Sequence, residues 1–213
     1  MSEYRRPTLP LVTYHDEKGA PIEYGARWKG ESPPEEAYSR TRNLERFLPL
    51  HSVAQSLSEW LEATFEVTVE HDPTVASDLL HAPADIVGAM RLIPHDASVA
   101  PLTFVLTSLT GVYVHAGLLH DFRFPVCGCD ACDEDVFGLA DELEWTVRTV
   151  VAGGYSEWFE PWPSPWIASK LEEPAGRMRS SRSRFHDLPI ERVRNAQAHI
   201  PDSGRWAAWP EKS

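Results

Sequence analysis

The sequence predicts one α+β domain in which helices pack on one face of an antiparallel β-meander. Short segments in its middle part alternate apolar and polar residues and are joined by brief, glycine-containing connections. Apolar residues at helical spacing occupy the stretches before and after that part. No linker poor in apolar residues divides the 213 residues, so a single domain is expected.

The predicted elements follow one another in a simple order. They are an irregular N-terminal segment (1–31), helices (32–65), mainly antiparallel strands (66–126), a cysteine cluster (127–132), a long helix (133–152) and an irregular Trp/Pro-rich and Arg-rich C-terminal segment with a short helix (153–213).

A helix start is predicted at Ser32, which can act as an N-cap before Pro33. Pro49 should break or kink this helix, and a second helical pattern follows at once. After the cysteines, the spacing of apolar residues predicts a long amphipathic helix with acidic residues in its first turn. These acidic residues are Asp133, Glu134 and Asp135, and the later carboxylates Asp141, Glu142 and Glu144 are expected on its solvated face.

Three histidines fall near the predicted hairpins and can be considered as a metal site. They are His95, His115 and His120. Pairing Val114 with Phe122 keeps one face of the sheet apolar, and that register turns His115 to the face opposite His120. We therefore interpret the three as solvated loop and edge histidines.

The C-terminal segment holds Trp158, Trp162 and Trp166 among prolines, which exclude a regular helix. The expected structure is a long loop that packs these rings on the core.

Composition limits the class of protein. The net charge of −12 and the pI near 5.2 oppose binding to a phosphate backbone, so no nucleic-acid partner is expected. No apolar stretch approaches the ~20 residues that span a bilayer, and residues 1–7 lack the apolar core of a secretory signal. The expectation is a cytoplasmic protein without a membrane partner.

All three cysteines lie within six residues, as Cys127, Cys129 and Cys132. In a reducing compartment such crowding indicates metal or redox chemistry more than a disulfide. Thiolates suit zinc, which prefers four tetrahedral N or S donors. Two alternatives stay open: a reactive thiolate at a helix N-terminus, which would make the chain an enzyme, and three partly buried cysteines without chemistry.

A zinc ion bound by three sulfurs needs a fourth ligand. The candidates near the cluster are Asp130, Asp133 and Glu134, and remote candidates are His71 and His186. The sequence does not choose among them.

A run of arginines forms the other candidate site. Guanidinium groups bind carboxylates and phosphates in a bidentate manner, so an anionic ligand is one interpretation. A solvated segment balanced by acidic residues elsewhere is the other. The run comprises Arg177, Arg179, Arg182 and Arg184.

Residues 124–134, with the following 144–148 and the closing 204–210, resemble an actinobacterial family known only as a domain of unknown function. The resemblance covers nearly the whole chain and implies a bacterial cytosolic protein without an assigned reaction. The leading hypothesis is a zinc-stabilised, non-catalytic binding domain whose partner is a protein or a small anionic ligand.

Overall fold

The computed structural model describes residues 3–108, 111–160, 163, 166–184 and 188–212. Its largest sheet has five antiparallel strands in the order β3-β4-β5-β6-β7, so each strand pairs with the next along the chain. The strands are β3 (Val67–His71), β4 (Ile86–Pro94), β5 (Leu102–Thr107), β6 (Gly111–Ala116) and β7 (His120–Phe124). The predicted meander and the α+β class are confirmed.

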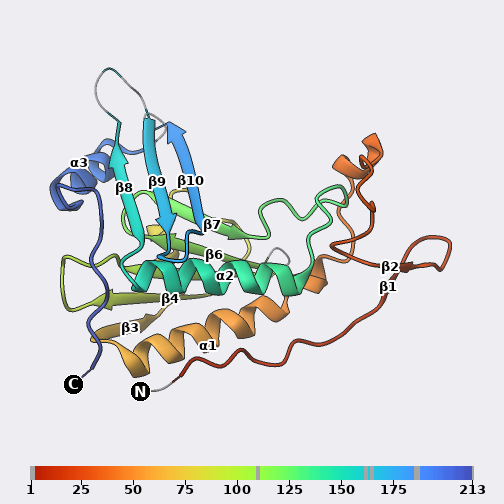
Figure 1. The fold of residues 1–213 in the computed structure, drawn as a ribbon, viewed down its shortest axis with the longest axis horizontal. Coiled ribbons are helices and arrows are strands. Elements are labelled where there is room, and N and C mark those ends of the chain that lie inside the picture. The colour runs from red at the N-terminus through yellow and green to blue at the C-terminus, as the bar shows by residue number, and fades with distance from the viewer. Residues whose placement is uncertain (1–2, 109–110, 161–162, 164–165, 185–187, 213) are drawn as a thin grey trace.

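Two helices, α1 (Pro49–Thr64) and α2 (Val136–Val151), run side by side and pack on one face of this sheet (Figure 1). The predicted register is also confirmed, because Val114 pairs with Phe122 and both are buried in the core. Leu57 of α1 and Leu143 of α2 are fully buried against this face. Burying one such side chain stabilises the fold by about 1.5–3 kcal/mol, which makes this layer the main source of stability.

The opposite face of the sheet is covered only in part. A 3₁₀ helix, η3 (Pro73–Asp78), places Val75 and Ala76 against Ala89 and Val105. Ile86 and Tyr113 pack against this small cluster.

The helix predicted from Ser32 is replaced by two short 3₁₀ helices, η1 (Glu35–Ser39) and η2 (Leu44–Phe47). Asn43 between them adopts a left-handed conformation, with φ of 51°, which interrupts a regular helix. Pro49 does not break a helix but begins α1, since its missing N–H costs nothing at the first position.

The C-terminal segment is more regular than predicted. It forms a second antiparallel sheet of order β10-β9-β8, followed by a helix. The elements are β8 (Tyr155–Phe159), β9 (Trp166–Glu172), β10 (Met178–Arg184) and α3 (Ile190–His199). Trp158 and Trp166 therefore lie in strands and not in a loop, while Trp162 falls outside the described residues. The prediction failed because β10 has no buried residue and therefore no apolar alternation.

The acidic residues before α2 are not in its first turn. Asp135 is the N-cap and accepts hydrogen bonds from the backbone N–H groups of Phe137 and Gly138. The solvated face predicted for α2 is also wrong at Glu144, which is 9% exposed. Its carboxylate accepts hydrogen bonds from the hydroxyl of Tyr4 at 2.7 Å and from Arg6. The segment before β1 (residues 3–13), which we call the N-terminal arm, therefore covers this side of α2.

The remaining strands, β1 (Tyr14–His15) and β2 (Pro21–Ile22), form a small hairpin away from the core (Figure 1). Within the described ranges, no helix is both long and apolar enough to cross a bilayer.

Candidate metal centre

The three cysteines meet in the loop between β7 and α2, which we call the cysteine loop (residues 125–135). Their sulfur atoms lie within 4.8 Å of one another, and the Sγ atoms of Cys129 and Cys132 are 3.4 Å apart. All three are free thiols; Cys129 is buried, and Cys127 and Cys132 are exposed. The loop thus gathers a three-sulfur group at the molecular surface.

Local backbone geometry explains why the sulfurs converge. Gly128 has a φ of +79°, a conformation that a residue with a side chain rarely adopts, and it turns the chain between Cys127 and Cys129. The N–H of Cys132 donates to the carbonyl of Cys129 at 3.2 Å, which closes a second turn. The carboxylate of Glu134 accepts hydrogen bonds from the N–H groups of Val126 and Gly128 and fixes the start of the loop.

The pKa values of Cys132 and Cys129 are shifted in opposite directions. Burial, together with hydrogen bonds to Cys129 and Cys127, raises the pKa of Cys132 to about 12. Burial also raises the pKa of Cys129, but hydrogen bonds from Cys127 and Cys132 outweigh it, so this pKa lies below its usual value. Metal binding would require these thiols to lose their protons, so any metal affinity of the group depends on pH.

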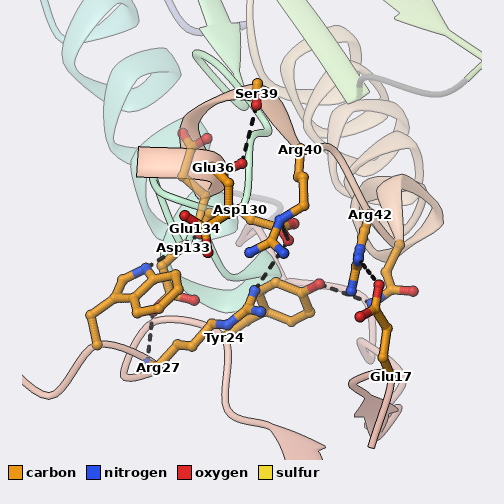
Figure 2. A network of polar contacts seen from close by, with 12 residues as sticks. Glu17, Tyr24, Arg27, Glu36, Ser39, Arg40, Arg42, Asp130, Asp133 and Glu134 are labelled. Carbon is orange, nitrogen blue, oxygen red and sulfur yellow. Dashed lines mark hydrogen bonds and ion pairs between the residues drawn. The ribbon is translucent and has the colours of Figure 1, made fainter. Parts of the chain in front are cut away.

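Asp130, one candidate for the fourth ligand, is fully buried but faces cations. Its Oδ2 lies 3.5 Å from Nη1 of Arg27 and 3.7 Å from Nε of Arg40 (Figure 2). Asp133 accepts from the backbone N–H of Arg27, and both oxygens of Glu134 are used within the loop. These neighbouring carboxylates therefore have structural roles.

The remote candidates do not complete the site either. Among the described residues, the group that can hold a metal comprises the three cysteines alone, without His71. His186 lies outside the described residues. Because Cys127 and Cys132 are exposed, the three-sulfur group is open to solvent on one side.

The cysteine loop also holds a distant part of the chain. The N–H groups of Asp130 and Ala131 donate to the carbonyls of Arg40 and Ala37, at 2.8 and 3.1 Å. The N–H of Gly25 donates to the carbonyl of Asp133 at 2.8 Å. Residues 24–46, which contain only short 3₁₀ elements, are thus attached to the loop that carries the sulfurs.

The hypothesis of a reactive thiolate depended on the N-terminus of α2. The side chain of Asp135 already accepts hydrogen bonds from the first free amides of that helix, those of Phe137 and Gly138. The helix N-terminus therefore has less capacity to stabilise a thiolate than the sequence suggested.

The arginines of the run have different partners. Arg177 and Arg179 both pair with Glu142 of α2, and Arg182 pairs with Glu160. Arg184 instead stacks on Trp166, with its guanidinium 5.2 Å from the ring. Arg179 and Arg184 also line a cavity of about 650 Å³ between β7 and β10.

Sequence reasoning missed His115 as a functional candidate. It was expected among solvated histidines, yet it is 5% exposed, and its Nδ1 lies 2.7 Å from Oδ1 of Asp121. The signal was present in the predicted register, which places position 121 directly across from position 115.

Comparison with known proteins identifies the family of the chain. A family model described as a family of unknown function (DUF6226) matches residues 10–213, so the chain belongs to that family. No curated protein and no solved structure matches it. The expected membership of a family of unknown function is confirmed, and the actinobacterial source remains a prediction.

Proposed function

We propose that this chain is a zinc-stabilised, non-catalytic binding domain of a reducing, cytoplasmic compartment. The observation that carries the proposal is the convergence of Cys127, Cys129 and Cys132 within 4.8 Å. A tetrahedral zinc with Zn–S bonds of about 2.3 Å holds its sulfurs about 3.8 Å apart, close to the spacing of the Cys129 and Cys132 sulfurs. A divalent ion would take the place of the thiol protons at these sulfurs.

The role proposed for the ion is structural. The cysteine loop is joined to residues 24–46 by backbone hydrogen bonds, whereas those residues have little regular structure of their own. Since metal-binding energy becomes folding energy where the site forms only on folding, zinc would order this part of the surface.

Metal analysis tests the proposal. Protein purified without added metal should contain about one zinc per chain. Cys129→Ser and Cys132→Ser should each lose the metal and lower the melting temperature. A chelator should lower the melting temperature of the wild type and leave these two variants unchanged. Variants that keep the wild-type melting temperature, with or without chelator, would contradict a structural ion.

For the ligand of the domain, we propose a small anion held in the cavity between β7 and β10. Arg123, Arg179 and Arg184 line it together with His81 and His120. Of these arginines, Arg123 and Arg184 have no acidic partner in the part of the chain that the structure describes. Two uncompensated guanidinium groups favour an anion despite the net charge of −12.

A thermal-shift assay with inorganic phosphate in low salt tests this ligand. The wild type should be stabilised, the shift should decrease with added salt, and Arg123→Gln with Arg184→Gln should abolish it. Arg177→Gln is the matched control, because that side chain pairs with Glu142 and does not line the cavity. Equal shifts in the double variant and the wild type, or no shift in either, would reject the anion site.

A further inference from the structure

A row of polar residues crosses the whole five-stranded sheet on the face turned away from α1 and α2. Residues directly paired in neighbouring strands share a face, and here the pairs follow one another from β3 to β7. The row consists of Glu70, Arg91, Thr103, His115 and Asp121. Thr103 and His115 are 2% and 5% exposed, and the side chain of Asp121 is 5% exposed. Burying such groups is costly unless each has a partner.

In the half of the row on β3, β4 and β5, the polar side chains bond to one another and to Asp78. The carboxylate of Asp78, at the end of η3, accepts two hydrogen bonds from Arg91, at 2.5 and 2.6 Å. It also accepts one from the hydroxyl of Thr103 at 2.6 Å, and Arg91 donates a further hydrogen bond to Glu70 at 3.1 Å. This half has a structural role, because Arg91 and the hydroxyl of Thr103 are hydrogen-bonded to carboxylates within it.

The other half leaves an acceptor free. Oδ1 of Asp121 lies 2.7 Å from Nδ1 of His115, and its Oδ2 accepts from the N–H of Leu80 at 2.9 Å. An ionised carboxylate only accepts, so Nδ1 of His115 carries the proton. In the neutral ring, Nε2 then has a lone pair, and it meets no hydrogen-bond partner among the residues that the structure describes.

The His115 ring lines a cavity of about 440 Å³, a size that suits a small ligand. Thr103 and Gly117 line it from the sheet side, and Glu191, Arg192 and Asn195 line it from α3. The wall at the β6–β7 turn is fixed by the fully buried Glu157, whose carboxylate accepts from the N–H groups of Leu118 and Leu119 at 2.9 Å. The cavity is therefore preorganised.

The lining offers hydrogen-bond donors as well as acceptors, since the side-chain amide of Asn195 can donate and accept. The two terminal nitrogens of Arg192 donate to the carbonyls of Ser77 and Asp78 at 2.6 Å, and Arg91 is engaged as described. Nε2 of His115 and the exposed carboxylate of Glu191 remain as acceptors. Two lining carboxylates, Asp78 and Glu191, balance the two arginines in charge. The matching ligand is uncharged and carries several hydroxyl groups, each of which can both donate and accept a hydrogen bond.

We propose that this cavity binds a small hydroxyl-rich molecule, the size of a monosaccharide, with Nε2 of His115 accepting one of its hydroxyl protons in a hydrogen bond. Asp121 acts as a positioning residue that fixes the ring and its tautomer. The site lies on the sheet and on α3, away from the cysteine loop. Its lining shares no residue with that of the anion cavity, although Asp121, which orients His115, also lines the anion cavity.

The test on the wild-type chain is a long-range ¹H–¹⁵N spectrum of the histidine rings, recorded with glucose, ribose or myo-inositol. At least one of these polyols should shift the Nε2 resonance of His115 in a saturable way, while the exposed His95 does not respond. Ethanolamine and inorganic phosphate are tested in parallel as a small amine and a small anion, the two alternative classes of ligand. No shift with any polyol, or a shift of His115 only with ethanolamine or phosphate, would overturn the proposal.

Variants separate a binding role from a structural one. In Asp121→Asn the amide can donate to Nδ1, so the proton moves to Nε2 and the acceptor is lost. Binding of the polyol identified above should weaken at least tenfold, although the strand amide spectrum stays that of the wild type. His95→Gln is the matched control and should bind normally. Unchanged affinity in a folded Asp121→Asn variant would overturn the role assigned to His115.

Discussion

The layer between the five-stranded sheet and its two helices is stabilised by extensive apolar burial, whereas the cysteine loop holds residues 24–46 by polar contacts and one small apolar cluster of Ala37, Cys129 and Ala131. Leu57, Leu143 and Phe104 are fully buried in the first region, which also has a continuous ladder of paired strands. In the second, single backbone hydrogen bonds and the pairs of Asp130 with Arg27 and Arg40 join segments far apart in sequence. We therefore expect the sheet and its two helices to fold without a metal ion. We expect the cysteine loop and residues 24–46 to become more ordered when a metal ion binds the sulfurs.

The largest effect is expected from a cavity in the apolar layer. Leu143 of α2 is fully buried, so Leu143→Ala should lower the free energy of unfolding by about 2–5 kcal/mol in urea denaturation. Leu11→Ala makes the same chemical change at a side chain that is 88% exposed and should alter it by less than about 0.5 kcal/mol. Similar losses in the two variants would show that burial in this layer does not dominate stability.

A smaller effect is expected where a polar contact ties the N-terminal arm to the same layer. Glu144→Ala removes the acceptor of the buried Tyr4 hydroxyl and of Arg6, and should cost about 1–3 kcal/mol. Asp141→Ala is the matched control, since this carboxylate meets Arg6 with its side chain 65% exposed and should contribute less than about 1 kcal/mol. A cost for Glu144→Ala no greater than that of the control would mean that the arm adds nothing to this layer.

The same contrast separates what the sequence could predict from what it could not. Alternation of Val112 and Val114 against Phe122 and Phe124 encodes both the strands and their register, because one face must be apolar. The helical stripe of α2 is encoded in the same way, through residues such as Leu143. Both features belong to the apolar layer.

Elements stabilised by other means left no such signal. Strand β10 has only exposed and half-buried residues, and it is held by its ladder with β9 and by pairs such as Arg179 with Glu142. Glu144 looked solvated because its partners, Tyr4 and Arg6, lie about 140 residues away in sequence.

The candidate site shows the same division. The three sulfurs lie close in sequence, so their grouping could be predicted from the chain alone. The attachment of the loop to Ala37 and Arg40, and the ion pairs of Asp130 with Arg27 and Arg40, depend on how distant segments meet. The fourth ligand therefore could not be chosen from the sequence, since every neighbouring carboxylate looked equally available.

Hydrogen exchange with and without zinc tests most directly the claim that a metal orders the cysteine loop and its partner segment. Adding a chelator should speed exchange at the amides of Gly25, Asp130 and Ala131, which are bonded between the two segments. Exchange at the paired amides of β5 and β6 should stay as slow as before, because apolar burial holds them. Unchanged exchange at the first group, or an equal increase in both, would contradict the account.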